Sequence, residues 1–335
     1  MSRRLTNLAL LALLAVAGTT GLLAYGVGTP DPATAVTVLH GLAGLAILTL
    51  IPWKQGIVRR GLARTRARKG RDAGIALAVL VPLSIFAGLV HAVGGWRPYV
   101  GLFPLQVHVG AAVAAVPFAV WHVLARQQRP RRTDLSRRTA VRALAIGAGG
   151  GAILFASEGA AALLGNSRLG GGRRQTGSHE VGSGDPAAMP VTNWFTDPVP
   201  SVDPATWRLH LVGRDVTRDE LDAGDRVTAT LDCTGGWYAS QDWSGTRLDR
   251  LLPALRADQS IDVVSVTGYR RRYPARDAPR LLLATRAGGQ PLSRGHGFPV
   301  RLVAPGRRGF WWVKWVDRVE VVDEPWWWQL PAPPT

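Results

Sequence analysis

The sequence predicts an N-terminal all-α transmembrane bundle of five helices, followed by a β-rich α+β domain. Five long segments with almost no charge occupy the first half of the chain, and short runs of alternating apolar and polar residues occupy the second half. A stretch rich in glycine, serine and arginine separates them. We therefore expect a transmembrane domain over residues 1–165, a linker over 166–186 and a second domain over 187–335.

Each of the five apolar segments is long enough to cross a bilayer, which takes about 20 apolar residues. Four of them carry no charge, and the fifth carries only Glu158. The segments are Leu5–Gly28, Ala33–Trp53, Ala73–Trp96, Pro98–Ala125 and Ala143–Leu164. A cleaved signal peptide would explain the first segment but not five, so we expect a multi-pass membrane protein.

The basic residues predict the orientation of these helices. The chain has a net charge of +17, and nearly all of the excess lies before the first helix, between helices two and three, and between helices four and five. Of the 19 basic residues in positions 1–169, only Arg97 and Arg168 fall on the other side. The N-terminus is thus expected in the cytoplasm and the second domain outside the cell membrane. Charge between apolar segments indicates topology, so membrane lipid, and not nucleic acid, is the expected partner.

One basic loop has a more specific pattern. The run Ser136-Arg137-Arg138-Thr139-Ala140-Val141 precedes the last apolar segment and resembles a twin-arginine export signal. Such a signal would export a domain that folds around its cofactor in the cytoplasm. The alternative is that the two arginines only help to fix the topology.

Four of the seven histidines lie in apolar segments, where a titratable ring is usually functional: His40, His91, His108 and His122. His108 and His122 are separated by 14 residues, which returns them to one helix face about 21 Å apart. This is the spacing by which one helix ligates two stacked haems in b-type cytochromes.

A weak internal repeat relates the second and fourth segments. His40 matches His108 in depth, about 10 Å from the outer face, and Lys54 takes the place of His122. We predict one outer haem b with His40 and His108 as iron ligands, and His91 as a third candidate at that level. An inner haem would lack a second histidine, because Lys54 is expected to extend to the cytoplasmic interface. Alternatively, the histidines only form hydrogen bonds between helices.

The second domain reads as short strands joined by turns, with one short helix at Arg247–Leu255. The expected strands are Trp207–Val212, Arg226–Asp232, Ile261–Thr267, Leu281–Thr285, Val300–Ala304 and Trp315–Val322. Cys233 is the only cysteine, so the chain cannot form an internal disulfide. The thiol lies at a strand end before two glycines, where a bulky ligand could approach it.

Three segments together resemble the molybdopterin domain of the sulfite oxidase family. They are Leu231-Asp-Cys-Thr-Gly-Gly-Trp237 with Asp242–Thr246 after it, Gly297–Pro305, and Gly309–Val319. The likeness covers about Pro190–Val322 and is closer to the bacterial branch, which includes the methionine sulfoxide reductase catalytic subunit. It implies a molybdenum–molybdopterin cofactor with Cys233 as the catalytic metal ligand, a role that suits a soft thiolate.

The resemblance also implies the residues that bind the pterin and its phosphate: Asn193, Cys233, Arg301, Arg308, Gly309 and Lys314. Sulfite oxidases have a basic residue soon after the cysteine. Here Thr234–Ser240 has none, which argues against sulfite as the substrate.

The sequence thus predicts an extracytoplasmic molybdenum oxidoreductase that acts on a small molecule. It would exchange electrons with the membrane quinone pool through a haem b domain, as haem-binding membrane subunits do. One alternative is a molybdenum enzyme whose helices carry no haem and only anchor it. The other is a non-catalytic membrane sensor or binding protein that has lost the metal.

Overall fold

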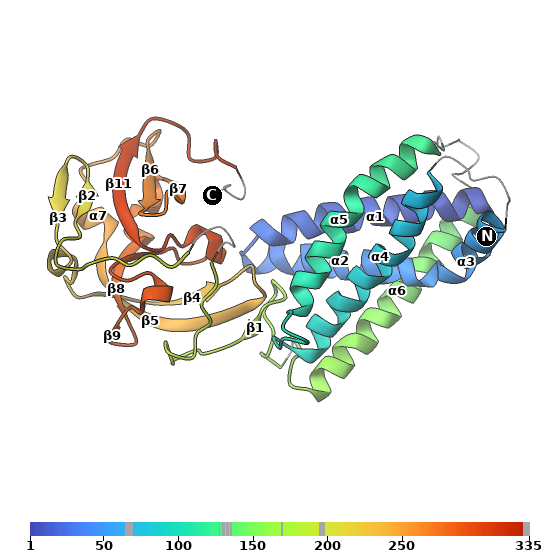
Figure 1. Cartoon of the computed structure of the whole chain (residues 1–335), viewed down its shortest axis with the longest axis horizontal. Helices are drawn as coiled ribbons and strands as arrows, with labels where there is room; N and C mark the ends of the chain where they lie inside the picture. The colour runs from blue at the N-terminus through green and yellow to red at the C-terminus, as the bar shows by residue number, and fades with distance from the viewer. Residues whose placement is uncertain are drawn as a thin grey trace. The chain divides into compact units, whose positions relative to one another are not determined.

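The computed structural model describes residues 1–63, 70–126, 128, 131, 134, 136–168, 170–193 and 198–330. The chain divides into two compact units. The first contains Met1–Tyr25 and Pro30–His179, and the second contains Gly26–Thr29 and Glu180–Thr335. Figure 1 shows helices in the first unit and strands in the second. The predicted combination of an all-α and an α+β domain is confirmed.

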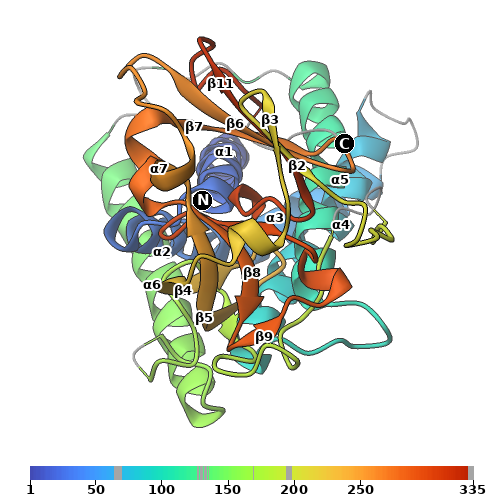
Figure 2. The same ribbon diagram turned by 90° about the vertical axis from the view of Figure 1, so that its left-hand side faces the viewer.

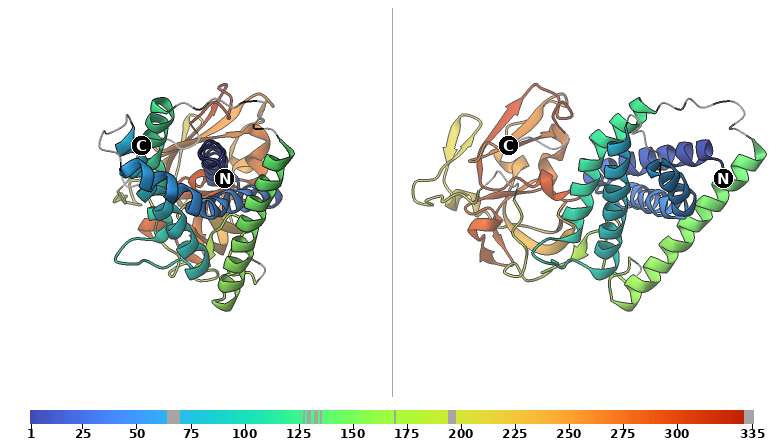
Figure 3. Two further views of the ribbon diagram at one scale, coloured as in Figure 1. Left: turned by 90° about the vertical axis from the view of Figure 1, so that its right-hand side faces the viewer. Right: turned by 45° about the vertical axis from the view of Figure 1, so that its right-hand side comes forward.

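The first unit consists of helices (Figures 1 and 3). They are α1 (Arg3–Gly26), α2 (Pro30–Thr49), α3 (Ile51–Leu62), α4 (Arg71–Gly94), α5 (Pro104–Ala125) and α6 (Arg137–Leu163). All except α3 are long and apolar enough to cross a membrane, and these five correspond to the predicted segments. Helix α4 packs mainly on α5, and α2 packs mainly on α6.

The second predicted segment is interrupted in the structure. Helix α2 ends at Thr49, and Trp53 lies in the separate helix α3. Pro52 causes this break, because proline lacks a backbone N–H and fits best in the first turn of a helix. Lys54 therefore lies on α3 and not on α2.

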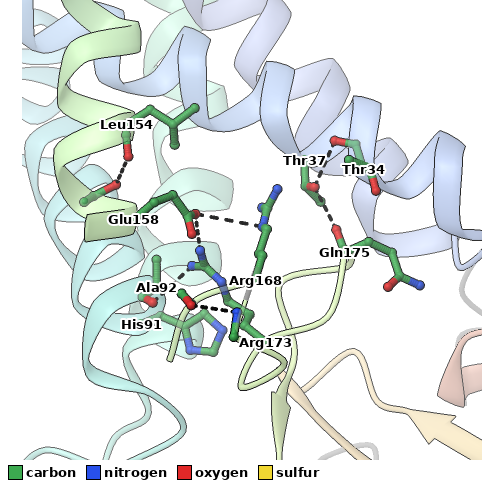
Figure 4. A network of polar contacts seen from close by, with 12 residues as sticks. Thr34, Thr37, His91, Ala92, Leu154, Glu158, Arg168, Arg173 and Gln175 are labelled. Carbon is green, nitrogen blue, oxygen red and sulfur yellow. Dashed lines mark hydrogen bonds and ion pairs between the residues drawn. The ribbon is translucent and has the colours of Figure 1, made fainter. Parts of the chain in front are cut away.

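Residues 170–179 of the predicted linker belong to the first unit, and the boundary between the units falls after His179. Figure 4 shows how this segment is held. The buried Arg173 forms an ion pair with Glu158 of α6 and donates a hydrogen bond of 3.1 Å to the Ala92 carbonyl. His179 Nε2 bonds the His91 carbonyl at 2.9 Å. The one charge within the fifth apolar segment is thus paired.

Two sheets make up the second unit (Figure 2). The first has the order β1-β5-β8-β10, with β4 on β5 and β9 on β8. Its strands are β1 (His179–Glu180), β4 (Asp225–Asp232), β5 (Trp237–Arg247), β8 (Leu282–Ala287), β9 (Gln290–Pro291) and β10 (Arg301–Val303). The alternating burial of β5 places Ala239 and Trp243 in the core.

The other sheet has the order β3-β2-β11-β6-β7. Its strands are β2 (Leu209–Leu211), β3 (Arg214–Val216), β6 (Ser260–Ser265), β7 (Arg270–Pro274) and β11 (Val316–Val322). Strand β11 lies between β2 and β6, parallel to the first and antiparallel to the second. The predicted helix at Arg247–Leu255 is the single turn α7 (Leu248–Leu251). Short 3₁₀ turns occur at Asp219–Leu221, Ala275–Arg280, Arg294–His296 and Gly309–Trp311.

Candidate functional site

Cys233 begins a tight turn between β4 and β5. Its backbone N–H donates to the Trp237 carbonyl at 2.9 Å, and the Gly236 N–H donates back to the Cys233 carbonyl at 3.2 Å. Gly236 has a φ of +88°, which favours glycine. The Gly235 N–H points to the sulfur, with 3.3 Å between N and Sγ. The turn therefore fixes the direction of the thiol.

The thiol opens into a pocket built from several segments of the second unit. The pocket is lined by Pro190, Thr192, Leu231, Cys233, Trp237, His296, Arg301, Gly309, Trp312 and Lys314. Four of the six predicted cofactor-binding residues are in this set. The other two lie beside it: Arg308 Nη2 is 3.4 Å from the Cys233 carbonyl, and Asn193 Oδ1 accepts a hydrogen bond from Lys314.

Burial raises the pKa of the Cys233 thiol, and the Gly235 N–H and the charges of Arg308 and Lys314 lower it in part. The free thiol is thus held protonated, and a metal that binds it would displace the proton.

Arg301 is the most completely buried cation of the pocket, with 1% of its surface exposed. Its guanidinium lies 5.1 Å from the Trp243 ring and 5.7 Å from the Trp312 ring. Nη1 donates to the His296 carbonyl at 3.0 Å, whereas Nε has no hydrogen-bond partner among the described residues. Burial lowers the pKa of Arg301 to about 10, so the side chain remains charged. A buried cation with an unused donor fits an anionic or hydrogen-bonding ligand.

The Arg308–Gly309 segment lies directly against the cysteine turn. Arg308 forms a buried ion pair with Asp232, the residue before the cysteine. A Cβ atom at Gly309 would lie 3.0 Å from Cys233 Cα. Glycine is therefore needed for the close approach of these two segments.

Lys314 connects three residues of the pocket wall by hydrogen bonds. Its ammonium donates to the carbonyls of Thr192 (3.0 Å) and Gly295 (2.7 Å) and to Asn193 Oδ1 (2.6 Å). These three bonds use its three N–H groups. Contact with a cofactor phosphate, as the resemblance implies, would require one of the bonds to be exchanged.

Sequence reasoning missed Thr192, His296 and Trp312 as lining residues. His296 Nε2 bonds the Met189 carbonyl at 2.9 Å, and its Nδ1 lies 2.8 Å from Ser293 Oγ. Burial, with Arg301 and Lys314 nearby, lowers the pKa of His296 to about 4, so the ring is neutral at pH 7. The sequence feature that could have pointed to His296 is its position immediately before the motif that begins at Gly297.

The predicted haem ligands come together within the first unit. The rings of His40 on α2 and His108 on α5 have centroids 5.7 Å apart, nearly perpendicular. His40 Nδ1 lies 2.9 Å from the Ala17 carbonyl, and His108 Nδ1 lies 2.8 Å from the Ser84 carbonyl. The His91 ring instead packs against His179 with centroids 4.9 Å apart.

The second unit is similar to known proteins. Residues 196–328 match the family model described as "Oxidoreductase molybdopterin binding domain". Mitochondrial sulfite oxidase of Mus musculus is 33% identical over 169 residues, which cover 38% of this chain and 31% of that protein. The nitrate reductase [NAD(P)H] of Hordeum vulgare is 27% identical over 203 residues, covering 44% of this chain and 23% of that protein. The solved structure of the sulfane dehydrogenase SoxCD from Paracoccus pantotrophus matches with a TM-score of 0.35 and 24% identity, over 38% of this chain and 41% of that chain.

The family model and the curated relatives support the class of protein that the motifs predicted. The second unit contains a molybdopterin-binding oxidoreductase domain that is similar to that of sulfite oxidases. The chain spans about a third of the length of the mouse sulfite oxidase that it matches. The pocket fits the cofactor of this family, because it combines one soft sulfur ligand, a buried arginine with an unused Nε–H and a glycine against the cysteine turn.

Proposed function

We propose that this chain is an extracytoplasmic molybdenum-dependent oxidoreductase. It would exchange electrons between a small-molecule substrate and the membrane quinone pool through haem b in the first unit. The observation that carries the proposal is the pocket in which the single cysteine and the buried Arg301 face the same space. The five apolar helices and the basic loops support a cell-membrane location with the N-terminus in the cytoplasm.

Within the pocket, Cys233 would hold the molybdenum, and Asn193, Arg301, Arg308, Gly309 and Lys314 would bind the pterin and its phosphate. The bound cofactor supplies two-electron redox chemistry, which no side chain of the pocket provides. Arg301 supplies a fixed positive charge with its Nε–H unused. The neutral His296 holds the adjoining wall through its bond to Met189. Trp237 and Trp312 add aromatic surface to the lining of the pocket.

The substrate is proposed to differ from sulfite. The turn after the cysteine has no Arg or Lys between Thr234 and Ser240, so a dianion has no cation on that side. Of the basic groups near Cys233, Arg308 is paired with Asp232, Lys314 donates to three oxygens, and Arg301 is assigned to the cofactor. A less charged small molecule fits these surroundings better.

The haem part of the proposal rests on the chemistry of His40 and His108. A backbone carbonyl lies within hydrogen-bond distance of Nδ1 of each ring, which leaves Nε2 of each ring as the nitrogen that can bind iron. Helices α2 and α5 are not closely packed against each other, and their rings meet across the space between them. One iron held by both Nε2 atoms would complete this site.

Single substitutions at these histidines test the electron route. His40→Ala and His108→Ala should each abolish the low-spin bis-histidine haem signal and quinone-linked turnover. Turnover with a soluble artificial electron partner should persist, because the molybdenum site is unchanged. His91→Gln, in which the removed ring faces His179, is the matched control and should retain both activities. Quinone-linked turnover that survives in His40→Ala would contradict the proposed route.

A further inference from the structure

The second unit includes four residues from the N-terminal part of the chain. These are Gly26–Thr29, which connect α1 to α2. Within this unit, Gly28 lies against the segment that leads from β10 to Arg308. A Cβ atom at Gly28 would lie 3.3 Å from the Gly306 carbonyl oxygen, 3.3 Å from Arg308 Cγ and 3.4 Å from the Arg308 backbone nitrogen. The loop is therefore in close contact with a residue that is expected to bind the cofactor.

The loop meets a β-turn that follows β10. The Arg307 N–H donates to the Ala304 carbonyl at 3.2 Å, which closes the turn. Gly306 has a φ of +79° and is preceded by proline, a combination typical of a type II turn. The turn therefore has a defined shape, and it leads directly into Arg308 and Gly309.

Glycine at position 28 is required by space and not by backbone conformation. Neither Gly26 nor Gly28 has a positive φ, so both positions accept other residues without backbone strain. A Cβ at Gly26 would meet no atom of the described residues within 4 Å, whereas a Cβ at Gly28 would press on Arg308. The two glycines of one loop thus differ in their contacts, which makes them a matched pair for substitution.

The contact matters because the charge of Arg308 is buried. Only 4% of its surface is exposed, and its guanidinium pairs with the buried Asp232. Nη2 lies 3.4 Å from the Cys233 carbonyl oxygen. Exclusion of water strengthens such an ion pair, provided that both charges stay paired. Gly28 lies beside the aliphatic stem of Arg308, so the loop forms part of the cover over this pair.

We propose that the Gly26–Thr29 loop is a positioning element of the cofactor site. It holds the Arg308 side chain on Asp232 and beside the Cys233 carbonyl. The proposal rests on the proposed molybdenum function of the second unit. It adds to that site a loop that lies far from residues 196–328, the part that matches the family model. The segment after α6 alone would therefore lack part of the site.

Cysteine labelling of the purified full chain tests the contact without the cofactor. Gly26→Cys and Gly28→Cys are each treated with a maleimide, and wild type gives the background from Cys233, the only native cysteine. Gly28→Cys should react about tenfold more slowly than Gly26→Cys, because a covered thiol reacts only when the loop opens locally. Equal rates at the two positions would overturn the contact.

Loss of molybdenum during dialysis of the full chain tests the positioning role. Gly28→Val should lose the metal about tenfold faster than wild type, the factor expected for loss of one hydrogen bond to a charged group. Gly26→Val is the matched control and should match wild type. Gly28→Ala, whose methyl group meets the same atoms, replaces Gly28→Val if that variant does not fold.

A double-mutant cycle shows whether the loop acts through Arg308. In an Arg308→Ala background, Gly28→Val should cause no further loss of molybdenum, because the side chain that valine displaces is absent. The unfolding midpoint, followed by tryptophan fluorescence, should show the same lack of a further effect, and it can be read even where little metal remains.

The outcomes separate this inference from the proposed function. Wild-type retention of molybdenum in Gly28→Val, or equal loss in Gly26→Val and Gly28→Val, would overturn the positioning role. Effects of Gly28→Val that are as large in the Arg308→Ala background would overturn it as well. A wild-type chain that contains no molybdenum would instead overturn the proposed function, whereas the labelling rates would still decide whether the loop contact exists.

Discussion

At the scale of single residues, the account depends most on Cys233. Its backbone is fixed by the turn to Trp237, and its sulfur faces the pocket beside Arg301. Burial raises the pKa of the thiol, so the sulfur is poorly suited to be a free nucleophile at neutral pH. A metal ligand, deprotonated only when the metal binds, is consistent with this environment.

Cys233→Ser should therefore abolish substrate turnover, with a loss of at least a hundredfold, because a hydroxyl is a poor ligand for a soft site. Expression and the haem spectrum should remain largely unchanged, since the haem ligands lie in the other unit. Thr234→Ser, one residue further along, serves as a control that should keep its activity. Activity equal to wild type in Cys233→Ser would exclude the molybdenum mechanism.

His296 makes the stability of the second unit depend on pH. Its pKa is about 4 in the folded chain and 6.5 when unfolded, so the unfolded chain binds the proton first as the pH falls. The stabilisation that the second unit gains from the neutral His296 is complete above pH 6.5 and declines between pH 6.5 and about 4. Over that window the free energy of unfolding falls by about 3 kcal/mol.

His296→Gln should flatten this part of the pH profile. Unfolding can be followed by tryptophan fluorescence, because only Trp53, Trp96 and Trp121 of the 13 tryptophans precede the second unit. Since carboxylates also titrate at low pH, the informative quantity is the difference between the wild-type and variant profiles. Parallel profiles from pH 7 to pH 4 would show that His296 does not titrate in this way.

At the scale of elements, the 3₁₀ turn Gly309–Trp311 is held from behind by two tyrosines. Tyr269 donates to the Phe310 carbonyl, and the fully buried Tyr273 donates to the Trp311 carbonyl. Burial raises the pKa of Tyr273 well above its ordinary value, so its hydroxyl remains a donor at any working pH. Strand β7 and the residues just before it thus position the turn that approaches Cys233.

Tyr273→Phe should destabilise the second unit by about 1–3 kcal/mol, because it leaves the Trp311 carbonyl without its donor. The turn should also hold the cofactor less tightly, which would appear as faster loss of molybdenum during dialysis. Tyr238→Phe, on the half-buried face of β5, is a suitable comparison. Identical melting and metal retention in Tyr273→Phe and wild type would argue against this positioning role.

The start of α6 carries the twin-arginine sequence. Ser136 caps the helix, with its Oγ accepting from the Thr139 N–H at 3.2 Å. Arg137 and Arg138 are exposed, and positive charge in the first turn of a helix is unfavourable. The two arginines therefore do not stabilise α6. Their presence at this position is consistent with a role in export.

Replacement of both Arg137 and Arg138 by lysine keeps the charge that sets topology but removes the export sequence. We expect the second unit to remain on the cytoplasmic side and to be protected from protease added outside. Arg142→Lys in the same helix is the charge-matched control. Cleavage from outside as efficient as in wild type would mean that the pair acts only on topology.

At the scale of the whole molecule, the features predicted from sequence are those that depend on local pattern. Length and apolarity predicted the five long helices. The strand patterns predicted β2, β4, β6, β8, β10 and β11 but missed β5, the strand that follows the Cys233 turn. The motif around Cys233 predicted the class of the second unit. Its expected ligands Arg301 and Gly309 lie with the cysteine in one pocket, although their roles remain predictions.

The features not predicted depend on residues far apart in the chain. Lys314 bonds Thr192 and Asn193, which are more than 120 residues away, and Arg173 bonds the Ala92 carbonyl, which is 81 residues away. The periodicity of the sequence does not predict such contacts.

The environments of the three consecutive C-terminal tryptophans could not be predicted from local pattern either. Trp326 lies by Arg307 of its own domain, whereas Trp327 and Trp328 are 63% and 68% exposed.

The central claim is that one chain carries both a molybdenum site and haem. The most direct test is to measure molybdenum by elemental analysis and haem by absorbance on a single purified sample. The full chain should be made in a host that supplies both cofactors. We predict one molybdenum per chain together with the Soret band of haem b. A folded sample that lacks either molybdenum or haem would contradict this claim.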